Sequence, residues 1–280
     1  MSVYSLSFNH DGSLLFCGLE NCIKAFSTGR PGRDCSTLPT YKRRGANTLK
    51  GIVSTLSVSP DGGILAAGGY SSTIAAYSTG DSSCICSFPS GHRNGVTQVK
   101  FSPDGRYLAS GARKDSEIRL WDLRNTGAPV HCFQRPGTTN QRITFDFNST
   151  GKYIISGSSS VPGEILAFSL NSQDNDNNGD KNDDKNQSSY QCSCDCEEID
   201  DCVNSVSVHR SLPLVAVGSG QRKLPLVCRR FNDNEVKEKE KIDDNDTDSE
   251  SEEENEKPLP LPPSDNTLRI MRLPFNWKEF

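Results

Sequence analysis

The sequence predicts an all-β protein of the β-propeller class, in which small antiparallel sheets repeat around a central axis. Three observations favour this class. A strand–turn–strand unit recurs five times, every unit has a glycine at the same offset, and helical periodicity is essentially absent. Only 33% of the 280 residues are hydrophobic, so we expect parts of the chain to lie outside the core.

The turn between the first two predicted strands marks each unit. Three of the five turns contain Asp-Gly, the strongest short signal for a β-hairpin. Successive turns in the first four units are 50, 43 and 46 residues apart, a spacing typical of propeller blades. The equivalent turn positions are Asp11, Asp61, Asp104, Thr150 and Ser211.

The second predicted strand of each unit contains a glycine seven residues after the turn position. The chain has 23 glycines in 280 residues, so composition alone does not account for five at one offset. The offset therefore indicates a structural repeat. These glycines are Gly18, Gly68, Gly111, Gly157 and Gly218.

The third predicted strand has isoleucine three residues before an aromatic residue in four units: 23–26, 74–77, 118–121 and 165–168. In the fifth unit this strand reappears at 268–273, with Met271 in the aromatic position. A weaker fourth strand would complete a blade. Closed rings have about four to eight blades, and we expect the five visible here to form an incomplete ring.

Two acidic segments interrupt the repeats. Residues 171–201 contain ten acidic side chains against two lysines, and residues 232–257 contain thirteen against four. Neither segment offers enough apolar surface to offset the entropy of ordering, so we expect two disordered acidic inserts. The predicted organisation is blades one to four at 1–170, an insert at 171–201, the first strands of the last blade at 202–224, a second insert at 225–266 and the last strand at 267–280.

The rest of the chain is basic. Outside the two acidic segments, the chain contains 25 basic and 13 acidic side chains. This balance suits a polyanionic partner, although a charge that merely aids solubility is the alternative. Within the second insert, three hydroxyl residues have Glu three positions downstream, the pattern that acidophilic kinases favour; a polar spacer is the alternative. These predicted phosphorylation sites are Thr247, Ser249 and Ser251.

The sequence lacks the signatures of an enzyme. No HExxH, glycine-rich phosphate loop or nucleophile elbow occurs, so we expect no catalytic residue, cofactor or small-molecule substrate. No apolar stretch approaches the roughly 18 residues of a membrane span, so we expect no membrane partner. One cysteine cluster has a spacing that can hold zinc, but it lacks the usual paired CxxC, and we favour no metal. Its members are Cys192, Cys194, Cys196 and Cys202.

The third unit, from Gly91-His92 to Trp121-Asp122, is the most complete and resembles the WD repeat. In that family a histidine, a strand hydroxyl, a turn aspartate and a strand tryptophan form a buried hydrogen-bonded set. The resemblance implies this structural role for His92, Ser110, Asp115 and Trp121. Three other units have Glu20, Ser71 and Pro162 at the aspartate position, so we expect packing and backbone ladders alone to hold them.

Peptides beyond the generic repeat resemble the telomerase Cajal body protein family. They lie at 26–35, 110–115, 121–124, 138–143, 211–214 and 219–222, and the resemblance covers the C-terminal part of that family's propeller. It implies a non-enzymatic RNA-binding scaffold for loop elements of small Cajal-body RNAs and telomerase RNA. Such a scaffold directs these particles, with their ribonucleoprotein subunits, to Cajal bodies in the nucleus and supports telomere maintenance. The alternative is a protein-only interaction hub.

An RNA-binding rim is predicted on one face of the propeller. The turns between second and third strands and the connections between blades open on the same face. Arg can stack on bases and bind phosphates, while Asn and Gln can read base edges. Ordinary solvated charges are the alternative, with Arg113 or Arg142 paired to Asp115 or Asp146. The predicted rim residues are Arg43, Arg44, Arg93, Arg113, Lys114, Asn140, Gln141, Arg142, Arg222 and Lys223.

Overall fold

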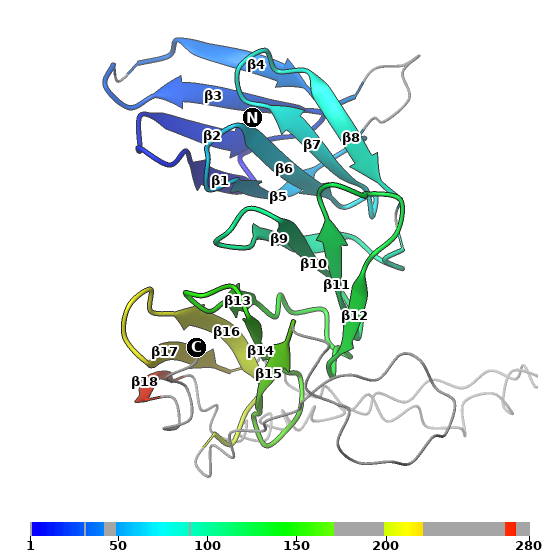
Figure 1. The fold of residues 1–280 in the computed structure, drawn as a ribbon, viewed down its shortest axis with the longest axis vertical. Coiled ribbons are helices and arrows are strands. Elements are labelled where there is room, and N and C mark those ends of the chain that lie inside the picture. The colour runs from blue at the N-terminus through cyan, green and yellow to red at the C-terminus, as the bar shows by residue number, and fades with distance from the viewer. Residues whose placement is uncertain are drawn as a thin grey trace, which may run out of the picture. The chain divides into compact units, whose positions relative to one another are not determined.

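The computed structural model describes residues 2–30, 32–41, 49–89, 91–170, 199–220 and 267–272. The described residues form eighteen strands in five antiparallel sheets and contain no helix (Figure 1). None of them, accordingly, makes a helix that could cross a membrane. The predicted all-β class is confirmed, because each repeated unit corresponds to one sheet.

Strands follow one another in chain order within every sheet. The first sheet contains β1 (Ser5–Phe8), β2 (Leu14–Gly18), β3 (Cys22–Ser27) and β4 (Cys35–Pro39). The second contains β5 (Val53–Val58), β6 (Ile64–Gly69), β7 (Ile74–Ser78) and β8 (Cys84–Phe88), and the third β9 (Val96–Phe101), β10 (Tyr107–Ala112), β11 (Glu117–Asp122) and β12 (His131–Gln134). The fourth contains β13 (Phe145–Phe147), β14 (Tyr153–Gly157) and β15 (Ile165–Ser169), and the fifth β16 (Val203–Val208), β17 (Leu214–Ser219) and β18 (Leu268–Arg272).

The Asp-Gly turns explain why the first two strands of a unit pair locally. In the third sheet Gly105 has φ +71°, a conformation that residues with a side chain rarely adopt. The carboxylate of Asp104 accepts hydrogen bonds from the Arg106 N–H at 3.1 Å and the Ser102 hydroxyl at 2.5 Å. The turn residues thus bond to their own backbone, which favours the hairpin before any tertiary contact forms.

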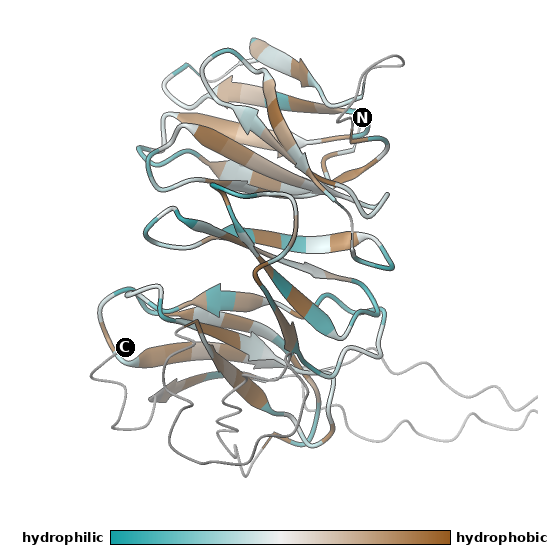
Figure 2. Cartoon of the chain, turned by 45° about the vertical axis from the view of Figure 1, so that its right-hand side comes forward, coloured by the Kyte–Doolittle hydropathy of each residue, from teal (hydrophilic) through white to brown (hydrophobic). Residues whose placement is uncertain are grey.

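The hydrophobic core lies between neighbouring sheets rather than within one. Each of four buried clusters joins two consecutive sheets. The cluster between the second and third sheets includes Ile74, Leu108 and Trp121, and the cluster between the fourth and fifth includes Ile155 and Val203. Figure 2 shows hydrophobic residues mainly along the strands and hydrophilic residues mainly along the turns. Burial of apolar surface between sheets is therefore what holds the repeats together.

The repeated glycine permits this close packing. A Cβ atom at Gly157 would lie 2.2 Å from the carbonyl oxygen of Val203 in the next sheet, and one at Gly68 would lie 2.6 Å from Cγ1 of Val96. Real Cβ atoms do not approach other atoms so closely. In the first four sheets, the glycine at the fixed offset is thus required where the first strand of the following sheet crosses.

The ring is open, as the sequence predicts. The first and fifth sheets stand at the two ends of the row of sheets (Figure 1). Apolar side chains at these ends are exposed: Leu6 and Phe8 of β1 are 62% and 58% exposed, and Leu268 and Ile270 of β18 are 78% and 74% exposed.

The predicted acidic inserts lie outside the described residues, apart from the last three positions of the first insert. Ile199 is buried in the cluster between the fourth and fifth sheets, and its carbonyl accepts a hydrogen bond from the Gly163 N–H at 2.8 Å. Asp201 is also buried. The packed chain of the fifth sheet therefore includes residues 199–201, which fall within the bounds 171–201 predicted for the first acidic insert.

Candidate nucleic-acid interface

Four buried side chains of the third sheet form one hydrogen-bonded set. The indole N–H of Trp121 donates to the Ser110 hydroxyl at 2.9 Å, which also bonds Nε2 of His92 at 2.8 Å. The other histidine nitrogen lies 2.8 Å from the Asp115 carboxylate. Both nitrogens of His92 are therefore engaged in structure. The set joins the connection before β9 to the turn after β10, which are the segments that carry Arg93, Arg113 and Lys114.

The charge of Asp115 makes this set sensitive to acid. Burial raises the pKa of Asp115, but the hydrogen bond and charge of His92, the Glu117 N–H and the charge of Arg119 together outweigh burial, so its pKa lies below the ordinary value of 3.8. A carboxyl with a lowered pKa contributes stability above its unfolded pKa, and this contribution disappears as the pH falls through the folded pKa. We expect the wild type to lose more stability than a His92→Ala variant when the pH falls below about 4. Urea unfolding at a series of pH values measures this difference, and equal losses in the two proteins would contradict it.

An arginine holds the fourth sheet in a similar way. Arg135, buried at the end of β12, donates from Nη1 to the Ser156 hydroxyl at 2.8 Å. Ser156 precedes the repeated glycine of its sheet, as Ser110 does in the third. Burial lowers the pKa of Arg135 to about 10, while Asp115 opposes that shift. The expectation that packing and backbone ladders alone hold this sheet is therefore wrong, because a guanidinium takes the place of the histidine.

The turns between second and third strands contact the connections between sheets. In the first two sheets, the Asn21 N–H donates to the Gly51 carbonyl at 2.8 Å and the Tyr70 N–H to the Ile52 carbonyl at 3.1 Å. The Arg113 N–H donates to the Gly95 carbonyl at 3.0 Å in the third sheet. These backbone bonds bring both classes of segment to one face, which we call the rim. It comprises the turns after β2, β6, β10 and β14 and the connections before β5, β9 and β13.

One arginine of the rim is paired with an aromatic residue from the neighbouring sheet. Nη2 of Arg113 donates to the hydroxyl of Tyr70 at 3.0 Å, and its guanidinium carbon lies 4.9 Å from the centre of the Tyr70 ring. Tyr70 is 45% exposed. Tyr70 was not among the predicted rim residues, although it lies two residues after the repeated glycine of the second unit, as Arg113 does in the third.

The other predicted rim residues that the structure describes differ in their exposure to a ligand. Arg93, Lys114 and Asn140 are exposed. Arg142 is also exposed; desolvation of its guanidinium lowers its pKa, and an electrostatic interaction with Tyr70 opposes the shift. Gln141 is half-buried and its amide oxygen accepts from the Cys202 thiol at 3.3 Å, which restricts it as a reader of bases.

Asp115 and Asp146, the alternative ion-pair partners considered for Arg113 and Arg142, bind other groups. Asp115 pairs with His92, and Asp146 forms an ion pair with Lys100 at 2.5 Å. Arg113 instead contacts Tyr70. The remaining candidates fall outside the described residues: the rim residues Arg43, Arg44, Arg222 and Lys223, and the phosphorylation sites Thr247, Ser249 and Ser251.

The cysteine cluster is described only at Cys202. Its thiol is buried and also donates to the Asn204 amide oxygen at 3.3 Å and the Gly220 carbonyl at 3.4 Å. In the part of the chain that the structure describes, no three His, Cys, Asp or Glu side chains are grouped to hold a metal ion.

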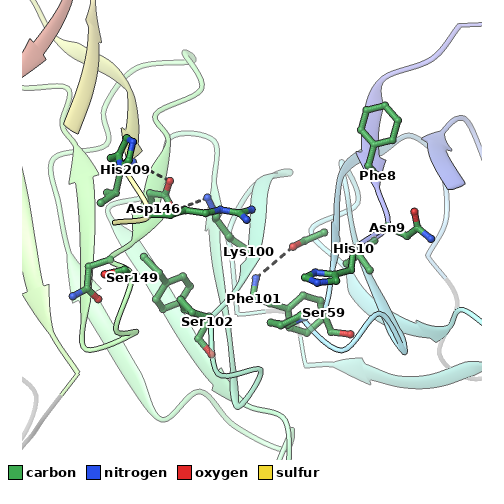
Figure 3. Close-up of a pocket in the computed structure, with 18 residues that line it drawn as sticks. Phe8, Asn9, His10, Ser59, Lys100, Phe101, Ser102, Asp146, Ser149 and His209 are labelled. Carbon is green, nitrogen blue, oxygen red and sulfur yellow. Dashed lines mark hydrogen bonds and ion pairs between the residues drawn. The ribbon is translucent and has the colours of Figure 1, made fainter. Parts of the chain in front are cut away.

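A cavity of about 660 Å³ opens at the ends of the first strands of the five sheets, β1, β5, β9, β13 and β16. Figure 3 shows Lys100, Asp146 and His209 on one side of it and Phe8, Asn9 and His10 on the other. These residues lie at or next to turns between first and second strands, at the other end of the strands from the rim. The cavity is therefore separate from the predicted RNA-binding residues.

Comparison with known proteins identifies the repeat. The WD domain, G-beta repeat family model matches residues 43–78 and 82–122. In the crystal structure of the mitotic checkpoint complex, one chain aligns with 78% of this chain and 59% of its own length, at a TM-score of 0.58 and 18% identity. This likeness shows the propeller fold alone.

Two curated relatives with higher identity over about four-fifths of the chain share one name. The chain is 40% identical to Telomerase Cajal body protein 1 of Homo sapiens over 224 residues, which are 80% of this chain and 38% of that protein. It is 31% identical to the Telomerase Cajal body protein 1 homolog of Drosophila melanogaster over 79% of this chain and 37% of that protein. The chain thus spans less than two fifths of the length of these relatives.

Proposed function

We propose, from the premise that this WD-repeat chain is similar to telomerase Cajal body proteins over four-fifths of its length, that it is a non-enzymatic RNA-binding scaffold. Its ligands are loop elements of small Cajal-body RNAs and of telomerase RNA. With the subunits of those particles it takes part in their delivery to Cajal bodies in the nucleus, and so in telomere maintenance.

One observation carries the proposal: cationic side chains from successive sheets lie on turns and connections that are bonded to one another on the rim. Arg93 and Lys114 are exposed and have no hydrogen-bond or ion-pair partner among the residues described. The nearby carboxylate of Asp115 is buried against His92 and does not neutralise them. Free cations beside an exposed aromatic ring suit a single-stranded RNA, which offers phosphates and unstacked bases.

Charge reversal on the rim tests the proposal. We expect the full chain to bind an RNA hairpin with an unpaired loop, and Arg113→Glu/Lys114→Glu to weaken this binding at least about tenfold in low salt. The wild-type association constant should fall steeply with salt, with a logarithmic slope of about 0.7 per phosphate contacted on a single strand. Fluorescence anisotropy across a salt series measures both quantities.

A matched variant carries the same charge change on the opposite face. Arg106 and Lys152 are exposed next to turns between first and second strands, and Arg106→Glu/Lys152→Glu should bind the hairpin more tightly than the rim variant. Far-UV circular dichroism and thermal unfolding check that both variants are folded. Capture of proteins without RNA, at a level that salt does not change, would support the protein-only hub instead.

A further inference from the structure

We propose that Tyr70 is the base-stacking residue of the rim, with Arg113 holding the ring and Arg142 offering a cation to the neighbouring phosphate. The ligand is an unpaired nucleobase in an RNA loop. This inference rests on the proposed RNA-binding function and assigns a contact residue within it.

Tyr70 is exposed and at the same time fixed. The residue is 45% exposed, whereas its hydroxyl accepts from Arg113 and its N–H donates to the Ile52 carbonyl. The backbone of Gly95 lies directly against it, since a Cβ atom at Gly95 would stand 2.9 Å from Cα and 3.2 Å from Cδ1 of Tyr70. A ring held by two sheets loses little conformational entropy when a ligand stacks on it, which favours binding.

The cations around Tyr70 have capacity for an anionic ligand. The guanidinium of Arg113 has five N–H donors, and its bond to the Tyr70 hydroxyl uses one of them, on Nη2. Its Nε is buried and has no hydrogen-bond partner among the described residues, so a ligand would contact the terminal nitrogens. Arg142 is exposed on the connection before β13, one sheet further along. Tyr70, Arg113 and Arg142 thus come from three successive sheets, so an extended strand that crosses them contacts an aromatic ring and two positive charges.

This combination favours a nucleic acid over a peptide. Every base has a π-face that can stack on tyrosine, and every nucleotide carries a phosphate for an arginine. An acidic peptide would use the arginines but would gain little from the ring. A peptide ligand is therefore an outcome of the test below rather than the expectation.

Three substitutions of Tyr70 test the stacking role in the full chain. The probe is a labelled RNA hairpin with a randomised unpaired loop, compared with a fully paired RNA duplex of the same length. Tyr70→Ala should weaken hairpin binding about tenfold without changing the salt slope, because stacking releases no counterions. Tyr70→Phe and Tyr70→Trp keep a stacking surface and should bind within about threefold of the wild type. The duplex should bind more weakly than the hairpin and should be insensitive to all three changes.

A control aromatic residue lies away from the rim. Phe8 is 58% exposed at the far end of β1, and Phe8→Ala should leave hairpin binding unchanged.

The outcomes separate the stacking role from the proposed function. If Tyr70→Ala bound the hairpin with wild-type affinity while the wild type showed salt-dependent binding, the stacking role would be overturned but the RNA-binding function would stand. No hairpin binding by the wild type would overturn the function itself. If Tyr70→Ala unfolds, reduced binding by folded Tyr70→Trp would overturn the inference. Equal binding of hairpin and duplex, or preference for an acidic peptide, would do so too.

Discussion

Replacement of Gly157 by valine is expected to lower the free energy of unfolding by about 3 kcal/mol, the upper end of what overpacking usually costs. A Cβ atom at this position would meet the Val203 carbonyl oxygen at 2.2 Å and its Cγ1 at 2.9 Å. The nearest atom belongs to backbone, so no change of side-chain rotamer relieves the contact, and the fourth and fifth sheets must separate. Urea unfolding followed by far-UV circular dichroism measures the loss.

Gly29 provides the matched control for this substitution. No atom lies within 4 Å of a Cβ built there, and its φ lies outside the left-handed region. Gly29→Val should therefore change the free energy of unfolding by at most about 0.5 kcal/mol, as is usual for surface substitutions. If the two valine variants were equally stable, close approach between sheets would not explain the repeated glycine.

The fold was predictable because its signals are local and repeated. Asp104 and Gly105 form their turn through bonds to residues next to them in the chain, and the same pattern recurs in other units. The repeated glycine could be read as a marker without knowing its cause. Its cause is tertiary, since Gly157 contacts Val203, which lies beyond the first acidic segment.

The site was predictable in part, for a related reason. Arg113 was found because basic residues in turns stand out in a sequence, and the turns of a propeller share a face. Tyr70 was missed because only basic and amide residues were expected on the rim, and its pairing with Arg113 spans 43 residues. Arg135 was missed because nothing local distinguishes a buried arginine from an exposed one at the end of a strand. Its contact with Ser156 joins consecutive sheets.

Removal of the His92 imidazole should be at least as damaging as the glycine substitution. His92→Ala leaves the buried Asp115 carboxylate without the partner that lowers its pKa, and Ser110 loses one of its hydrogen bonds. Leaving a buried charge without its partner typically costs about 3–5 kcal/mol, so we expect a loss of about 4 kcal/mol in the free energy of unfolding. Urea unfolding at pH 7 measures it, with His10→Ala, an exposed turn histidine, as the control.

A double variant separates the network from simple packing. In His92→Ala/Asp115→Ala the orphaned carboxylate is removed as well, so the combined loss should be smaller than the sum of the two single losses by about 1 kcal/mol or more. Losses that simply add would mean that the two residues stabilise the sheet independently.

The hydrogen-bonded set of His92, Ser110, Asp115 and Trp121 joins the connection before β9 to the turn after β10, which carry Arg93 and Arg113. His92→Ala should therefore also weaken hairpin binding at temperatures where the variant is still folded, whereas His10→Ala should not.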